Sequence, residues 1–384
     1  MNVPNSFGEW VAMQGRVPHT PTTVDELLEF HQHAAELKNA QEAESDLGAG
    51  LDIRDVFIPV SIDSNNETSR GPPAQWTTTI RGRIYTPDAA HGSRGPYPLV
   101  VYFRSGLILG DLESEDSTCR QISKLARSVV VNVEYRKPPK YKYPTPLQDC
   151  WDALQWAARN ARSQLGADPQ NRGFIVGGTS IGALFATAMA IRARETNFFP
   201  PISGQILRSP VTIHPALAAS YAGEPLHSHL AKVDYPIHSS HLHQQIFESY
   251  GVPDEDTNNP FVSPLLAQSL SGLPPAYFQI TGLDLSKDEG LRYEQRLAEA
   301  GVQTKKDTYE SMPHAFWMYP RLKGAADAAR DLISGVQWLE AKSGWDSGVR
   351  EEVDVWVKDA AVAEGEKAWR ERKLCRLEGC DCFM

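Results

Sequence analysis

The sequence has no long apolar segment. A membrane-spanning helix needs about 20 consecutive apolar residues, and no stretch of this 384-residue chain approaches that length. The first ten residues, MNVPNSFGEW, also lack the basic and apolar regions of a secretory signal. We therefore expect a protein without a membrane span that is located in the cytoplasm.

Cysteine is scarce, and the five cysteines are an odd number. Cys119 and Cys150 stand alone in segments with helical periodicity, so a disulfide framework is not expected. The other three crowd the carboxyl end in CRLEGCDCFM. Their spacing matches no common zinc pattern, and Cys382 is one place too late for prenylation. We expect reduced thiols in a frayed tail, with no metal and no cofactor.

Basic residues are fewer than acidic ones. The 38 Lys and Arg against 48 Asp and Glu give a formal net charge of -10. Nucleic-acid binding needs a basic face, so this balance argues against nucleic acid as a partner. The hydrophobic share of 41% and the charged share of 22% are ordinary for a globular protein. A small molecule is the expected ligand class.

Apolar runs of strand length alternate with helical segments from residue 98 onward. Within the runs apolar and polar residues do not alternate, which is typical of parallel strands that helices cover on both faces. The runs lie at residues 98–103, 129–135, 173–178, 204–210, 275–282 and 302–309, and helical periodicity, as at 147–161, separates most of them. The pattern predicts an α/β fold with a mostly parallel, doubly wound sheet.

Two further strand candidates precede this region. Residues 56–62 and 77–87 are separated by the polar, proline-rich loop 63–73. We expect them to form an antiparallel pair. With this pair the predicted sheet has about eight strands.

The sequence divides into three predicted regions. Residues 1–50 contain a helical stripe at 22–45 that precedes any strand and is free to form part of a helical cap. Residues 51–343 form the core, and within it the strand and helix alternation breaks at about 211–263, where a lid insertion is expected. Residues 344–384 form a charged helix and tail. This helix packs either on the sheet or on a second subunit, which would make a homodimer.

Ser180 stands between Gly178 and Gly182 in GFIVGGTSIGALFATAMA, residues 173–190, at the junction of a predicted strand and a predicted helix. This arrangement is typical of a nucleophile elbow, in which a strained turn exposes the serine hydroxyl at the start of a helix. A structural explanation also exists, because any sharp strand-to-helix turn favours small residues. We favour the elbow.

A serine hydroxyl needs a base and an acid to become a nucleophile. Asp284 follows one predicted strand and His314 follows the last one, in the order expected after an elbow serine. In isolation Asp284 could be a helix N-cap and His314 an ordinary loop histidine. In this order they predict a catalytic triad, with Asp288 as the alternative acid.

Several of these segments resemble the hormone-sensitive lipase family of α/β-hydrolase esterases. The resemblance covers about residues 97–340 and rests on VEYRKPPKYKYPTPLQDCWDALQW, GGTSIGA, MPHAFW and the stretch NNPFVSPLLAQSLSGLPPAYFQITGLDLSKDEGLRYEQRLAEAGV. It implies the α/β-hydrolase fold with a cap built from residues 1–50 and the insertion at 211–263. It also implies Ser180 as nucleophile, Asp284 as acid and His314 as base.

The sequence departs from this family after the strand 98–103. There the family carries a histidine and three glycines, whose N–H groups form the oxyanion hole together with the N–H after the serine, here that of Ile181. This chain reads VVYFRSGLILGD, with Arg104 in place of the histidine and Ser105 and Leu107 among the glycine positions.

Two interpretations of this loop are open. In one, Arg104 and Leu107 line the substrate site, where the guanidinium holds a carboxylate or a developing oxyanion. In the other, Arg104 makes a structural ion pair with Asp111 or Glu113. In this second case the N–H groups of Ser105 and Gly106 still form the hole.

Histidine is concentrated in the predicted lid. No carboxylate or cysteine accompanies these histidines at a recognised metal-site spacing, so we expect a polar, mobile lid and no metal site. The six lid histidines are His214, His227, His229, His238, His241 and His243.

The leading prediction is a serine hydrolase that cleaves a carboxylic ester or lactone of a small molecule through an acyl-enzyme. The altered loop motivates an alternative, in which the same fold catalyses a non-hydrolytic cyclisation, condensation or elimination on a specialised metabolite. A second alternative is a catalytically inactive binding module. The complete set of Ser180, Asp284 and His314 argues against it.

Overall fold

The computed structural model describes residues 23, 26, 46–62, 77–88, 95–223, 225–230, 239–318 and 323–343. Most of the predicted cap helix at 22–45, His238 of the lid and the charged tail at 344–384 with its three cysteines lie outside the described residues. Within the segment predicted as that helix, the N–H of Glu26 donates to Thr23 Oγ1 at 3.2 Å, a contact typical of a helix N-cap.

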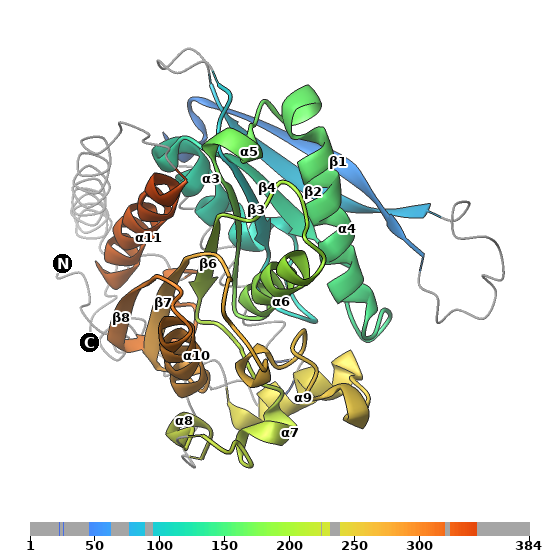
Figure 1. The fold of residues 1–384 in the computed structure, drawn as a ribbon, viewed down its shortest axis with the longest axis vertical. Coiled ribbons are helices and arrows are strands. Elements are labelled where there is room, and N and C mark those ends of the chain that lie inside the picture. Colours follow the sequence, from blue (N-terminus) through green and yellow to red (C-terminus); the bar gives the residue numbers. More distant parts are fainter. Residues whose placement is uncertain are drawn as a thin grey trace, which may run out of the picture.

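Eight strands among the described residues form one sheet in the order β1-β2-β4-β3-β5-β6-β7-β8 (Figure 1). β1 and β2 are an antiparallel hairpin, β2 is antiparallel to β4, and the neighbours from β4 to β8 are parallel. This confirms the predicted fold class. The bounds are β1 Leu51–Ser61, β2 Thr77–Pro87, β3 Leu99–Phe103, β4 Val129–Glu134, β5 Phe174–Thr179, β6 Gly204–Arg208, β7 Ala276–Leu283 and β8 Thr304–Pro313.

The central strands are buried on both faces. Along β3, Leu99, Val101 and Phe103 contribute to one hydrophobic cluster, whereas Val100 and Tyr102 contribute to another on the opposite face. Successive side chains of a strand point to opposite faces, so a strand covered on both sides must be apolar throughout. This explains why these segments lack polar alternation.

Helices cover the two faces of the sheet (Figure 1). α3 and α11 pack on the smaller cluster, and α4, α6 and α10 pack on the larger one. Cys119 of α3 and Cys150 of α4 are buried. The α-helices are α3 Asp116–Ala126, α4 Thr145–Asn160, α5 Pro169–Arg172, α6 Ile181–Glu195, α7 Pro215–Ala218, α8 His227–Leu230, α9 Ser240–Tyr250, α10 Lys287–Glu299 and α11 Lys323–Lys342.

Shorter helical turns complete the described elements. They are the 3-10 turns η1 Asp46–Gly48, η3 Leu112–Glu115, η5 Asp254–Asp256, η6 Pro264–Leu266 and η7 Phe316–Met318, and the π-helical turn η4 Ala161–Leu165. None of the helices in the described part of the chain is long and apolar enough to cross a membrane.

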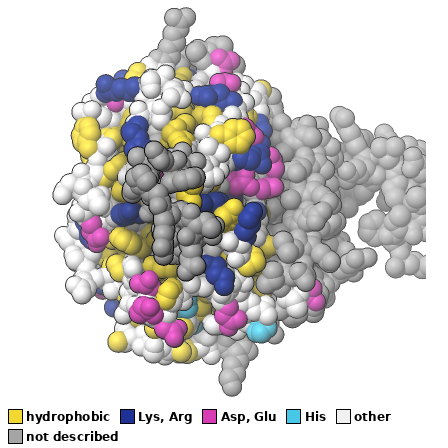
Figure 2. All heavy atoms as spheres, turned by 90° about the vertical axis from the view of Figure 1, so that its right-hand side faces the viewer, with side chains coloured by type: hydrophobic (Ala, Val, Ile, Leu, Met, Phe, Trp, Pro, Cys, Tyr) yellow, Lys and Arg dark blue, Asp and Glu magenta, His cyan; other side chains and the backbone are white. Residues whose placement is uncertain are grey.

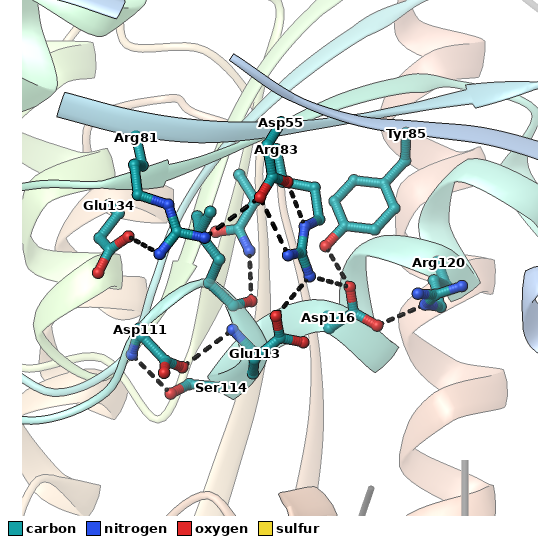
Figure 3. Close-up of polar contacts among 12 residues, drawn as sticks. Asp55, Arg81, Arg83, Tyr85, Asp111, Glu113, Ser114, Asp116, Arg120 and Glu134 are labelled. Carbon is teal, nitrogen blue, oxygen red and sulfur yellow. Dashed lines mark hydrogen bonds and ion pairs between the residues drawn. The ribbon is translucent and has the colours of Figure 1, made fainter. Parts of the chain in front are cut away.

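An ion-pair network ties the β1–β2 hairpin to the start of α3 (Figure 3). Arg83 of β2 contacts Asp55 of β1 at 2.6 Å, Glu113 of η3 at 2.8 Å and Asp116 of α3 at 3.1 Å. Burial would raise the pKa of Asp116, but hydrogen bonds from Arg120, Tyr85 and Arg83 outweigh it, so the pKa is lowered. The network holds the segment that directly follows the loop after β3.

The outer face on the side of β1 and α4 carries side chains of both charges among hydrophobic ones (Figure 2). Phe57 of β1 is exposed, with 74% of its area accessible. Lys and Arg do not form one continuous field over the described part of this face.

Candidate active site

Ser180 occupies the sharp turn between β5 and α6. Its backbone has φ 59° and ψ -118°, a positive φ that non-glycine residues rarely adopt and that is typical of strained functional positions. The Ser180 N–H donates to the carbonyl of Arg208 at the end of β6, at 2.8 Å. This geometry is the one expected of a nucleophile elbow.

The two glycines of the elbow are required by close packing. A Cβ on Gly182 would overlap the carbonyl oxygen of Phe103 and would lie 2.6 Å from that of Arg104, and a Cβ on Gly178 would overlap the backbone of Gly182. The first turn of α6 therefore lies directly against the end of β3. The two interpretations of these glycines, a sharp structural turn and a nucleophile elbow, are compatible. The close packing that requires glycine also brings the loop after β3 beside Ser180.

Asp284 and His314 contact each other at the edge of the sheet where the strands end. Asp284 follows β7 and His314 follows β8, and His314 Nδ1 lies 2.8 Å from Asp284 Oδ2. The carboxylate also accepts hydrogen bonds from Thr281 Oγ1 at 2.6 Å and from the Ser286 N–H at 2.9 Å. Both side chains are buried, and Ser180 follows β5 at the same edge. The structure thus joins the predicted acid to the predicted base.

Asp288, the alternative acid, faces a different element. Its Oδ2 accepts the N–H of Ser228 in α8 at 2.7 Å, and its own N–H donates to Ser228 Oγ at 3.3 Å. The carboxylate that contacts His314 is therefore Asp284.

Arg104 differs from both sequence-based interpretations. Its side chain has 0% exposure, and it donates to main-chain carbonyls rather than to a carboxylate. Nη1 donates to Gly106 O and Leu109 O, both at 2.6 Å, and to Ser105 O at 3.1 Å. Nη2 donates to Tyr135 O at 3.1 Å, and the guanidinium carbon lies 3.9 Å from the centre of the Tyr135 ring.

The expected ion-pair partners of Arg104 have other roles. Asp111 accepts the N–H of Glu113 at 3.0 Å and caps η3, while Glu113 pairs with Arg83. Leu107, expected at the substrate site, is buried in the larger hydrophobic cluster. The buried guanidinium of Arg104 therefore holds the carbonyl groups of its own loop, the one that follows β3.

The three predicted oxyanion-hole residues follow neighbouring parallel strands, at the same edge of the sheet. Ser105 and Gly106 follow β3, Ile181 begins α6, and β3 pairs with β5, with Phe103 opposite Gly178. Gly106 has φ +75°, and a Cβ there would lie 3.0 Å from Leu109 O, so the chain needs glycine at this position.

Two residues that the sequence analysis did not assign also hold this loop. Tyr135 Oη donates to Gly106 O at 2.9 Å and contacts Arg104 O at 3.2 Å, and Lys137 Nζ donates to Gly110 O at 2.6 Å. Burial and then the nearby Arg104 cation lower the pKa of Lys137. The segment VEYRKPP contained a signal for these roles, because Tyr135 and Lys137 directly follow β4, the strand beside β3.

The described part of the predicted lid packs on the core through buried groups. Leu242 of α9 clusters with Leu109, and Ile246 packs beside them, so α9 contacts the loop after β3. His214 and His243 each lie 4.9 Å from Phe247 between ring centroids, and burial lowers the pKa of His214. This packing differs from the polar lid that the sequence predicted.

His229 of α8 anchors the same region to α10. Its Nε2 lies 3.2 Å from Glu289 Oε2, and the N–H of Thr212 donates to Glu289 Oε1 at 3.1 Å. Burial would lower the pKa of His229, but Glu289 outweighs it, so the pKa is raised. Among the residues that the structure describes, no group of three or more metal-ligating side chains occurs.

Comparisons with known proteins support the same fold. The profile of a family described as "alpha/beta hydrolase fold" matches residues 100–318. The esterase LipI of Mycobacterium tuberculosis is 34% identical over 66% of this chain and 77% of its own. The versiconal hemiacetal acetate esterase of Dothistroma septosporum is 32% identical over 68% of this chain and 78% of its own.

Among solved structures, that of vibralactone cyclase is similar with a TM-score of 0.76 and 28% identity, over 90% of this chain and 98% of that one. The profile match spans more than half of the chain. Sequence motifs, sheet order and relatives all lead to the same assignment. The chain belongs to the hormone-sensitive lipase family of α/β-hydrolases.

Proposed function

We propose that this protein is a serine esterase that cleaves a carboxylic ester or lactone of a small molecule through an acyl-enzyme. The observation that carries the proposal is the contact of 2.8 Å between His314 Nδ1 and Asp284 Oδ2, at the sheet edge where Ser180 occupies the elbow. Esterases among the relatives support the same reaction class.

The proposed reaction begins with attack of Ser180 Oγ on the substrate carbonyl carbon. His314 Nε2 takes the hydroxyl proton, while Asp284 accepts a hydrogen bond from Nδ1–H and stabilises the imidazolium. The tetrahedral intermediate places its negative oxygen near the N–H of Ile181 and N–H groups of the loop after β3. His314 then gives the proton to the leaving alcohol oxygen, and the acyl group remains on Ser180.

Water completes the proposed cycle. His314 takes a proton from a water molecule, and the resulting hydroxide attacks the acyl carbon. Collapse of the second tetrahedral intermediate releases the carboxylic acid and returns the proton to Ser180 Oγ. The ester bond is broken with one water consumed, and no cofactor enters any step.

A second candidate reaction shares the first half of this cycle. The similarity to vibralactone cyclase over 90% of the chain favours it. A hydroxyl group of the acyl chain itself would then attack the acyl carbon in place of water. The acyl chain would be released from Ser180 as a lactone, and His314 would transfer the hydroxyl proton to Ser180 Oγ. The two candidates differ only in the nucleophile that removes the acyl group.

Covalent labelling with a fluorophosphonate tests the proposal, with Ser180→Ala as the control, beside hydrolysis of p-nitrophenyl acetate, butyrate and octanoate. We expect labelling and hydrolysis, both lost in the control. Cyclisation would be favoured if the protein is labelled, if only a hydroxyacyl ester releases p-nitrophenol, and if mass spectrometry identifies a lactone as the product. Neither labelling nor hydrolysis would contradict both and favour a binding module.

A further inference from the structure

We infer that Arg104 is a positioning residue that shapes the oxyanion hole, holding the carbonyl groups of the loop after β3 on one side so that the loop N–H groups face the other. This inference rests on the proposed function. It assigns to Arg104 neither contact with substrate nor a surface ion pair. The loop that lacks the family histidine and glycines would thus be rebuilt around a buried guanidinium.

Peptide geometry links the Arg104 contacts to the N–H groups. The peptide bonds between Arg104 and Leu107 are trans, and in a trans peptide the C=O and the following N–H point in opposite directions. Nη1 of Arg104 binds the carbonyls of Ser105 and Gly106. The N–H groups of Gly106 and Leu107 belong to these same two peptides, so they point away from the guanidinium.

Tyr135 and Lys137 extend the same arrangement along the loop. Tyr135 Oη lies 3.2 Å from Arg104 O, so the Ser105 N–H in that peptide points away from Tyr135. Lys137 Nζ holds Gly110 O at the far end of the loop. Within the described part of the chain, no atom accepts a hydrogen bond from the N–H groups of Ser105, Gly106 or Leu107. These donors remain for a ligand.

The loop lies where such donors would serve Ser180. The position of a Cβ on Gly182 is 2.6 Å from Arg104 O, so the loop contacts the first turn of α6. That turn begins with Ile181, whose N–H is the other proposed donor. The helix N-terminus and the loop would therefore present N–H groups to the same oxygen, the arrangement that stabilises an oxyanion.

The burial of Arg104 makes its contacts obligatory. Within the described residues its side chain makes no ion pair, and Nε has no hydrogen-bond partner. A buried cation is costly unless other groups stabilise its charge. Here four main-chain carbonyls and the face of the Tyr135 ring stabilise the guanidinium. Lysine has a single ammonium group instead of a planar fork of donors, so it cannot reach the same set of carbonyls.

The test compares Arg104→Met and Arg104→Lys with a matched control, Arg296→Met. Arg296 also donates to main-chain carbonyls, those of Leu265 and Ala267, but it lies in α10, away from the loop. Three quantities are measured: kcat and KM for p-nitrophenyl acetate, the inhibition constant of a trifluoromethyl ketone, which forms a tetrahedral oxyanion adduct with an active serine, and the melting temperature.

We expect both Arg104 variants to lower kcat about 100-fold, the scale of one lost oxyanion donor, with little change in KM. Affinity for the trifluoromethyl ketone should fall by a similar factor, because catalysis and analogue binding depend on the same donors. Arg296→Met should lower the melting temperature and leave kcat and the inhibition constant unchanged. An effect of Arg104→Met on melting temperature alone would overturn the inference.

A milder variant covers the case in which the Arg104 variants do not fold. Tyr135→Phe keeps the ring under the guanidinium and removes only the hydroxyl that binds the Gly106 and Arg104 carbonyls. We expect it to lower kcat and the affinity for the ketone together, by up to about tenfold. Unchanged values of both in a folded Tyr135→Phe would contradict the inference. Hydrolysis that survives in Ser180→Ala would instead contradict the proposed function itself.

Discussion

Asp284 and Asp288 are separated by one helical turn in sequence, yet they have different partners. Asp284 accepts hydrogen bonds from Thr281, Ser286 and His314, whereas Asp288 exchanges hydrogen bonds with Ser228 of α8. Asp284→Asn should lower kcat for an activated ester by at least about 100-fold, because the amide favours the wrong imidazole tautomer.

Asp288→Asn is the matched control for this prediction. It removes the same charge within the same turn but leaves the His314 contact in place. We expect less than about a threefold change in kcat, since the Asp288 carboxylate contacts Ser228 of α8 rather than His314. Equal losses in the two variants, measured under saturating substrate, would reassign the acid.

Ser180 and His314 should act as a unit. If His314 activates Ser180, each single change to Ala removes nearly all activity, and the double variant costs little more. Steady-state hydrolysis of p-nitrophenyl butyrate by the two single variants and the double variant measures this coupling. Losses that multiply would show that the two residues contribute independently.

At this scale the sequence predicted the order and the strand ends of Ser180, Asp284 and His314, because the elbow glycines and apolar strands mark them. It did not predict the direction of Arg104. A charged residue after a strand is usually exposed, and its burial here depends on Tyr135, which is 31 residues away in sequence. Such long-range contacts leave no local pattern.

At the scale of elements, α8 and α10 attach the described part of the insertion at 211–263, predicted to be a lid, to the core. His229 contacts Glu289, and Asp284 and Asp288 are further carboxylates that act on it. His243 faces it from α9, with 6.1 Å between the ring centroids. We expect this pair to make the stability of the attachment depend on pH.

The sign follows from the pKa directions. Against the ordinary pKa of 6.5, burial would lower the pKa of His229, but Glu289 raises it. Burial also raises the pKa of Glu289. Because both pKa values are raised, the folded pair binds a proton more tightly than the same groups do in the unfolded chain. The stabilisation from His229 is therefore fully present below pH 6.5 and is lost as the pH rises through its raised pKa.

We predict that the free energy of unfolding declines more steeply between pH 6 and pH 8.5 in the wild type than in His229→Gln. Denaturant titrations at several pH values measure the two slopes. His241→Gln serves as a control, because His241 is exposed and its replacement should leave the slope unchanged. If the free energy of unfolding changed with pH equally in the wild type and in His229→Gln, the prediction would be wrong, because the pair would then contribute nothing to the pH dependence.

The sequence predicted elements with long apolar runs better than elements in which apolar and polar residues are mixed. All strands of the parallel core were predicted, but β1 begins at Leu51 rather than at 56, because its half-exposed first residues pair with the end of β2, Leu51 opposite Pro87. In the insertion predicted to be a lid, the helices α7 and α8 span four residues each. Such short helices do not repeat a hydrophobic period, so the packing around Phe247 was not predictable.

At the scale of the whole molecule, the antiparallel hairpin is joined to the parallel core through charge as well as through the sheet (Figure 3). Asp55 lies directly opposite Arg83 in the β1–β2 register, and Arg83 reaches on to Glu113 and Asp116. The sequence predicted the hairpin, but it did not reveal these links. They connect residues on four elements, β1, β2, η3 and α3, that no periodicity relates.

Arg81 and Arg83 lie on the same strand and differ in burial, which makes them a matched pair for testing this connection. The Arg83 side chain is 14% exposed and faces the buried Asp116, whereas that of Arg81 is 48% exposed. Arg83→Met should lower the free energy of unfolding by about 1 to 3 kcal/mol, the scale of hydrogen bonds to charged groups. Arg81→Met should cost less than about 1 kcal/mol, since exposed ion pairs contribute little.

Denaturant unfolding of both variants measures these costs, and ester hydrolysis measures whether the effect reaches the site. Asp116 keeps Tyr85 and Arg120 when Arg83 is replaced, so the start of α3 should stay in place and kcat should change by less than about threefold. A large loss of kcat in Arg83→Met with a small loss of stability would contradict this expectation. The loop after β3 would then depend on the hairpin, and the buried Arg104 would not be sufficient to hold it.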